Sequence, residues 1–227
     1  MNGRLVALGD SITRGGGEPM LGLAGSPWVQ LLADALGLQC ENLACDGATA
    51  GQVLHEQLPH AGERAVLACL YVGVNDTRDP GWDAARFAAD LEAIVAALMP
   101  RARATMLATI PEDLGRPTAA PKPREASAII RAAAGRHRAV VVALDDLAGR
   151  DLVLPDAVHL TAAGEAEIAR RALAALVARG LAPANAAVSA EPDRSPAALA
   201  AWRRHRAAWL ARDLRRRRRE RVARDAG

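Results

Sequence analysis

The chain lacks several features that define whole classes of protein. It has three cysteines in 227 residues (Cys40, Cys45 and Cys69), and no paired spacing among them favours a disulfide scaffold or a zinc site. No H-E-x-x-H motif is present, and we expect neither a metal nor a cofactor. No apolar run approaches the roughly 18 residues of a membrane span, and the first residues do not resemble a signal peptide. These absences predict a cytoplasmic protein.

Net positive charge is confined to the C-terminal segment. Lys122 is the only lysine, and the formal net charge is +3. Eleven arginines against three acidic residues between Arg203 and Asp225 give this segment a charge of +8, which leaves −5 for the rest of the chain. The basic character therefore belongs to the tail and indicates nothing about the partners of the main domain.

Short apolar runs alternate with helical patterns over the first 180 residues. We predict strands at 4–10, 38–45, 65–73, 104–110 and 139–147. We predict helices at 26–37, 51–61, 82–99, 124–137 and 161–180. Ser26 is expected to be the N-cap of the first of these helices, with Pro27 at its first position. Five apolar strands separated by helices favour a parallel sheet covered on both faces.

The polar residues that chemistry would need follow directly after these strands. Ligands of such sheets bind beyond the carboxyl ends of the strands. The segments there are Gly9-Asp10-Ser11, Asp46-Gly47, Gly73-Val74-Asn75-Asp76 and the loop at 155–159. Each of them, taken alone, is as readily a turn or a helix cap.

A serine hydroxyl becomes an effective nucleophile when a histidine, itself oriented by a carboxylate, takes its proton. Ser11 is the candidate nucleophile, His159 the candidate base, and Asp156 can reach back to the imidazole from three residues away. The other histidines lie in or at the ends of helical patterns: His55, His60, His137 and His205.

Acyl transfer also requires hydrogen-bond donors for the oxyanion of the tetrahedral intermediate. The side chain of Asn75 and the backbone N–H groups of Gly47 and Ser11 are candidates. In the alternative interpretation, Gly47 only permits a left-handed turn, and Asn75 with Asp76 only caps the next helix. Four independent strand ends that carry the right residues in the right order favour the functional interpretation.

In order along roughly the first 180 residues, these segments resemble the four blocks of SGNH (GDSL-type) hydrolases. The blocks are Gly9-Asp10-Ser11, "NLACDG" ending at Gly47, "GVND" at 73–76 and "DAVH" at 156–159. The resemblance implies a flavodoxin-like three-layer α/β/α sandwich with a five-stranded parallel sheet of order 2-1-3-4-5. It also implies a triad of Ser11, Asp156 and His159, and an oxyanion hole of Ser11, Gly47 and Asn75. Asp10 matches as a structural neighbour of the nucleophile.

The function expected from these residues is a serine esterase or deacylase that acts on a small acyl ester through an acyl-enzyme. Acyl transfer to another acceptor by the same site stays open. A non-catalytic phosphate-binding, nucleotide-binding or signalling domain of the same topology is the other alternative, but the phosphate-loop motif is absent and Lys122 does not follow the fifth strand. The absence of G-x-S-x-G excludes a nucleophile elbow.

The rim of the pocket and the tail carry less information. Arg14, Gly15, Gly16 and Gly17 are expected to border the substrate, with the loop at 112–123 as a second rim; in the alternative interpretation, the glycine-rich segment is only a mobile connector. Acyl length, leaving group and oligomeric state do not follow from the sequence. We divide the chain into a hydrolase domain (1–180), a linker (181–196) and an Arg-rich helical tail (197–227). No nucleic acid partner is expected; the tail tryptophans are expected to pack on the main domain, although the basic helix could also touch an anionic surface.

Overall fold

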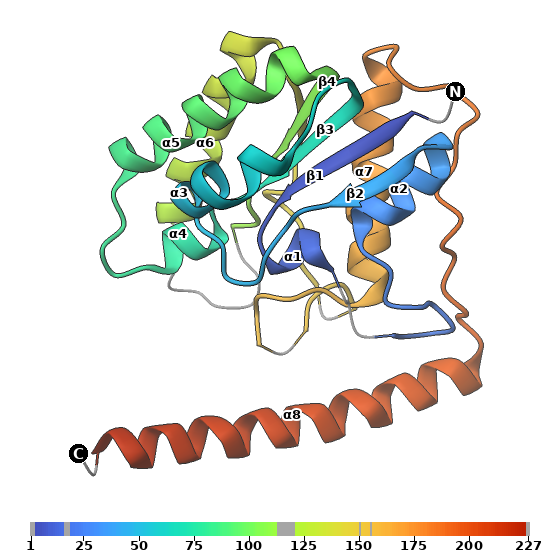
Figure 1. Ribbon diagram of the computed structural model, residues 1–227. Helices are drawn as coiled ribbons and strands as arrows, with labels where there is room; N and C mark the ends of the chain where they lie inside the picture. Colours follow the sequence, from blue (N-terminus) through green and yellow to red (C-terminus); the bar gives the residue numbers. More distant parts are fainter. Residues whose placement is uncertain (1–2, 16–18, 113–120, 150, 155, 226–227) are drawn as a thin grey trace.

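A computed structural model describes residues 3–15, 19–112, 121–149, 151–154 and 156–225. Its centre is one parallel sheet of five strands in the order β2-β1-β3-β4-β5 (Figure 1). The strands are β1 (Arg4–Gly9), β2 (Gln39–Asn42), β3 (Ala65–Tyr71), β4 (Ala102–Ala108) and β5 (Val140–Val142). The register pairs Leu5 of β1 with Leu67 of β3 and Gly9 with Tyr71.

Helices connect the strands and cover the sheet. They are α1 (Ser11–Arg14), α2 (Trp28–Leu36), α3 (Ala50–Gln52), α4 (Val74–Arg78), α5 (Ala84–Leu98), α6 (Pro121–His137), α7 (Ala162–Ala178) and α8 (Pro196–Asp225). A π-helical turn η1 (Val53–Gln57) and two 3-10 turns, η2 (Leu58–His60) and η3 (Met99–Arg101), complete the set.

The sheet lies between two helical layers. Helices α2 and α7 pack together on one face, and α5 packs with α6 on the other (Figure 1). The central strands β1 and β3 are buried almost throughout, because helices exclude water from both of their faces. This arrangement confirms the predicted three-layer sandwich and its strand order.

Both edge strands are shorter than predicted. The strand expected at 38–45 covers only Gln39–Asn42 and is partly exposed, and the strand expected at 139–147 covers only Val140–Val142. An edge strand pairs on one side only, so fewer hydrogen bonds hold the chain extended there. After β5 the backbone N–H of Leu144 donates to the Thr109 hydroxyl (2.8 Å), and Leu144 turns into the core.

The single helix expected at 51–61 is three short segments. Thr49 and Gln52 form a capping box at the start of α3. The chain then widens into the π turn η1 and tightens into η2, which contains Pro59. A proline ring inside a regular helix clashes with the preceding turn, so the segment cannot continue as one α-helix.

The expected N-cap of α2 is also wrong. The helix begins at Trp28, Pro27 occupies the N-cap position, and no side chain of its own caps it. The carboxylate of Glu165, from α7, instead accepts the backbone N–H of Trp28 at 2.9 Å. A cap from a distant segment leaves Ser26 without this role, and local spacing gives no sign of it.

The segment after α7 runs back along the main domain. Val188 and Ala190 are buried in its core, and the Arg170 guanidinium donates to the Ala190 carbonyl (2.8 Å). Helix α8 then extends beyond the sandwich (Figure 1). Its Trp202 is buried, whereas Leu210 and Leu214 are 40% and 64% exposed. None of the helices described is both long and apolar enough to cross a membrane.

Candidate active site

Ser11 lies where β1 ends and α1 begins, at the carboxyl edge of the sheet. The neighbouring Asp10 is buried, and its Oδ1 accepts the backbone N–H of Ile12 (2.9 Å), which caps α1. Gly9 has φ +152°, and a Cβ there would lie 2.3 Å from the Tyr71 carbonyl oxygen. The turn therefore requires glycine and directs the first residue of α1 outward from the sheet.

The loop before α7 brings an aspartate and a histidine to the same serine. Oδ1 of Asp156 accepts the backbone N–H groups of Val158 (2.9 Å) and His159 (3.0 Å). Its Oδ2 lies 2.7 Å from His159 Nδ1, and His159 Nε2 lies 3.0 Å from Ser11 Oγ. The three side chains predicted from the sequence thus form one hydrogen-bonded row, in which His159 and Ser11 are 148 residues apart in the chain.

The two charged members of this row shift each other's protonation. The hydrogen bond to Asp156 raises the pKa of His159 above its usual 6.5; burial opposes the shift, and the charges of Asp156, Asp10 and Asp46 support it. Burial alone would raise the pKa of Asp156, but the hydrogen bonds from His159 and Val158 outweigh it and lower the pKa. The aspartate is therefore ionised over the range in which the histidine titrates.

Two further carboxyl groups are buried behind the serine. Burial raises the pKa of Asp10 to about 7 and that of Glu165 to about 8, against the effect of the backbone hydrogen bond that each accepts. Tyr71 is buried beside them, and burial together with the nearby Asp10 and Glu165 raises the pKa of its hydroxyl. These acids sit in the core and not in the open row, which agrees with a structural position for Asp10.

The three expected oxyanion donors lie at neighbouring strand ends. No described residue accepts a hydrogen bond from the backbone N–H of Ser11 or of Gly47. Gly47 is exposed in a turn with φ +75°, a conformation that favours glycine. Asn75 lies in α4, and its Nδ2 donates to the Ala48 carbonyl (3.1 Å), which leaves its second amide hydrogen available. Asn75 does not cap α5, because Asp83 does.

The expected rim is described in part. Arg14 is exposed and pairs with Asp46 (2.6 Å), and Gly15, with φ +80°, packs closely against Pro27. Gly16 and Gly17 lie outside the described residues, as do residues 113–120 of the second expected rim. Cys45 is exposed in the turn before Gly47.

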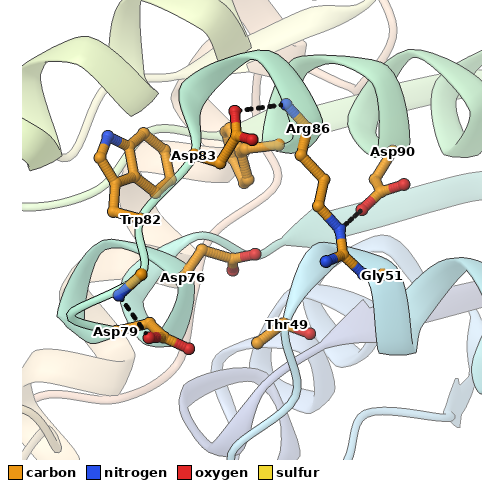
Figure 2. A pocket seen from close by; sticks show the side chains of 10 residues that line it. Thr49, Gly51, Asp76, Asp79, Trp82, Asp83, Arg86 and Asp90 are labelled. Carbon is orange, nitrogen blue, oxygen red and sulfur yellow. Dashed lines mark hydrogen bonds and ion pairs between the residues drawn. The ribbon is translucent and has the colours of Figure 1, made fainter.

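A polar cleft beside Asn75 could not be predicted from the sequence. Figure 2 shows the cleft between the start of α3 and the start of α5. Its volume is about 200 Å³. Four aspartates, one arginine and two aromatic rings contribute to its lining: Asp76, Asp79, Asp83, Asp90, Arg86, Trp82 and Phe87. Ser11, Asp156 and His159 do not line this cleft, so it lies beside the hydrogen-bonded row and does not include it.

The role of one buried glutamine was not predicted from the sequence either. Gln57, in the π turn η1, hydrogen bonds through its side-chain amide to both the backbone N–H and the carbonyl of Gly9. A polar residue inside a helical pattern is usually solvated, and the sequence carries no signal that this one faces the core.

A serine, a histidine and an aspartate joined in one row at the carboxyl edge of a parallel α/β sheet are the arrangement of a serine hydrolase. The GDSL-like lipase/acylhydrolase family matches residues 7–167. The chain therefore belongs to this family, the SGNH hydrolases, and is an acylhydrolase that acts on esters.

Solved structures support the fold, whereas no curated protein matches the chain. LAE5, an alpha/beta hydrolase enzyme from the metagenome of Lake Arreo, is 22% identical with a TM-score of 0.62, over 77% of this chain and 96% of that one. Axe2, an acetylxylan esterase from Geobacillus stearothermophilus, is 18% identical with a TM-score of 0.60, over 77% and 94%. A catalytic mutant of Axe2 with alanine in place of a serine also matches at 18% identity, with a TM-score of 0.63 over 78% and 95%.

Proposed function

We propose that this acylhydrolase is a serine esterase that works through an acyl-enzyme on Ser11. One observation carries the proposal: the continuous row from Asp156 Oδ2 to His159 Nδ1 (2.7 Å) and from His159 Nε2 to Ser11 Oγ (3.0 Å). These are the distances at which a histidine can take a hydroxyl proton while a carboxylate holds its ring. Replacement of a serine in Axe2 gives a catalytic mutant, which supports the same role for Ser11.

In the first half of the reaction, His159 Nε2 removes the Ser11 proton as Oγ attacks the ester carbonyl carbon. The carbonyl oxygen becomes an oxyanion, and the N–H groups of Ser11 and Gly47 and the free amide hydrogen of Asn75 donate to it. The tetrahedral intermediate collapses when the bond to the leaving alcohol breaks. His159 gives its proton to that alcohol, and the acyl group remains on Ser11.

In the second half, water takes the place of the alcohol. His159 removes a proton from the water, whose oxygen attacks the acyl carbon, and the same donors hold the second oxyanion. The bond to Ser11 Oγ then breaks, Oγ recovers the proton from His159, and the carboxylic acid leaves. The His159 side chain is 47% exposed, so solvent water has access to the imidazole.

We propose that the charge of the cleft beside Asn75 selects which leaving groups the enzyme accepts. Its four aspartates against Arg86 give it an excess of negative charge, so an anionic leaving group would be repelled. A neutral, hydroxyl-rich alcohol can donate hydrogen bonds to the carboxylates. Because Axe2 is an acetylxylan esterase, we propose acetylated sugars as the first substrates to test.

The test is the turnover of a short p-nitrophenyl ester by the S11A variant, with S189A, a change at an exposed serine, as the matched control. We expect S11A to lose hydrolysis while its melting temperature stays near that of the wild type, and S189A to keep full activity. Undiminished turnover by S11A would overturn the assignment. Esters of increasing acyl length, acetylated xylo-oligosaccharides and an anionic acyl thioester, compared by kcat/KM, then define the substrate.

A further inference from the structure

The side-chain amide of Gln57 forms hydrogen bonds with both backbone polar groups of Gly9. Gln57 Oε1 accepts the Gly9 N–H at 2.9 Å, and Gln57 Nε2 donates to the Gly9 carbonyl at 2.8 Å. The amide is 3% exposed, so neither hydrogen bond competes with water. The amide thus supplies the acceptor and the donor that a neighbouring strand would otherwise provide for the N–H and the carbonyl of Gly9.

Gly9 needs such a partner because the neighbouring strand has already ended. Ala7, two residues earlier, accepts the N–H of Leu43 at the end of β2. Gly9 points its N–H and carbonyl to the same edge, since alternate residues of a strand share a side. Among the described residues that follow Leu43, Cys45 supplies the backbone N–H that reaches Gly9, at 3.2 Å from the Gly9 carbonyl oxygen. The Gly9 N–H has Gln57 as its partner.

The π turn explains how Gln57 reaches this edge. In η1 the N–H of Leu58 binds the carbonyl of Val53, five residues earlier. A π turn contains one residue more than an α-helical turn, so it rotates the residues near its end around the helix axis by about 100°. Such single turns cost stability relative to an α-helix and are frequent at functional sites. Here the π turn ends at Gln57, whose side chain binds the last residue of β1, directly before Asp10 and Ser11.

We propose that Gln57 is a positioning residue for Ser11, an inference that rests on the proposed function. The Gly9 carbonyl belongs to the peptide group that leads to Asp10, so fixing its plane fixes the start of α1. Ser11 Oγ then stays 3.0 Å from His159 Nε2, and the Ser11 N–H stays directed at the oxyanion. Glycine has no side chain to lock this peptide, and a displacement of about 1 Å in a reacting group can cost roughly 10² in rate.

The test compares Q57M and Q57E with the wild type. Methionine keeps the length of the side chain and loses both hydrogen bonds. A protonated glutamic acid keeps one donor and one acceptor, whereas the ionised form keeps acceptors only and faces the Gly9 carbonyl with like charge. Q39E and Q39M, at an exposed glutamine of β2, are the matched controls. The readouts are kcat and KM for a p-nitrophenyl ester across pH, normalised to sites titrated with a fluorophosphonate, and the melting temperature.

We expect kcat per titrated site to fall about 10- to 100-fold in Q57M, with KM changed less than about threefold. The ratio of kcat in Q57E to kcat in Q57M is expected to exceed one at acid pH and to decline as pH rises. This ratio cancels the titration of His159, which both variants share. Should Q57M not fold, the ratio of Q57E to the wild type replaces it and is expected to decline in the same way.

A kcat per titrated site within about threefold of the wild type in Q57M would overturn the proposal, because a purely structural glutamine lowers stability without slowing the folded enzyme. A ratio that is flat across pH contradicts it as well. Failure of the proposed function is distinguishable: in that case S11A keeps its turnover and the fluorophosphonate labels no site in the wild type.

Discussion

Glu165 of α7 caps α2 by accepting the backbone N–H of Trp28 at 2.9 Å, across 137 residues of chain. The carboxylate is buried, and α7 begins shortly after His159. One hydrogen bond therefore joins the helix that follows the histidine to the helix that leads away from the serine segment.

Because Glu165 is buried, we expect the folded chain to become less stable as the pH rises. The pKa of Glu165 is about 8 in the folded chain and 4.5 in the unfolded chain, so the folded state binds more protons between these values. Stability decreases with pH wherever the folded state binds more protons. E165Q keeps an acceptor for the Trp28 N–H without a charge. Above pH 8 we expect its free energy of unfolding to exceed that of the wild type by on the order of 1 kcal/mol or more.

Chemical denaturation of E165Q and the wild type at a series of pH values measures this difference. E191Q, at an exposed glutamate, is the control and should leave the pH dependence unchanged. Parallel curves for E165Q and the wild type would show that the carboxyl group is not the source of the effect.

The row at the sheet edge predicts the pH profile of activity. The reaction needs neutral His159, and Asp156 raises the pKa of this histidine, so kcat/KM of the wild type should rise with pH through a midpoint above 6.5. In D156N the hydrogen bond to an anion is lost, and the midpoint is expected to move down. We expect kcat to fall by about 10²–10⁴ at the same time, because the ring loses its orienting carboxylate. A pH–rate profile with an unchanged midpoint in D156N contradicts this assignment.

Asn75 is expected to act on the transition state and not on substrate binding. N75A should lower kcat by about 10²–10³ with little change in KM, the usual cost of one oxyanion donor. It also loses the hydrogen bond to Ala48, which costs about 1 kcal/mol of stability. Steady-state kinetics with thermal melts separate the two effects, and N185A, at an exposed asparagine, serves as the control. A loss of stability alone would rule out the oxyanion role.

Trp202 fastens α8 to the main domain. Its ring is 6% exposed and packs with Met20 and Leu21 of the segment after Ser11 and with Ala162 at the start of α7. W202A loses this contact. We expect the loss to weaken the docking of α8 on the main domain by about 3–5 kcal/mol. We expect trypsin to cleave near Arg203 and Arg204 several times faster than in the wild type. W209A, at a partly exposed tryptophan, should be cleaved at the wild-type rate; equal rates in all three proteins would contradict this docking.

Local patterns were sufficient for the layers of the fold. The apolar run at Leu5–Leu8 and the helical spacing of Phe87, Leu91 and Ile94 lie in β1 and α5 as predicted, because burial on both faces of a strand or along one stripe of a helix sets these patterns. The ends of edge strands and the broken helix at 50–60 were not predictable in this way. There the outcome depends on which partners the neighbouring segments supply.

The sequence by itself determined the alternation of strands and helices, and with it the placement of Ser11, Gly47, Asn75 and the 156–159 loop at one edge of a parallel sheet. It did so because the carboxyl ends of parallel strands must meet at the same edge. Only the tertiary structure decided that Gln57 binds Gly9, that Glu165 caps α2 and that Trp202 packs against Met20, Leu21 and Ala162. Those contacts join residues 40 or more positions apart. A local sequence pattern shows that a residue needs a partner but not which distant residue supplies it.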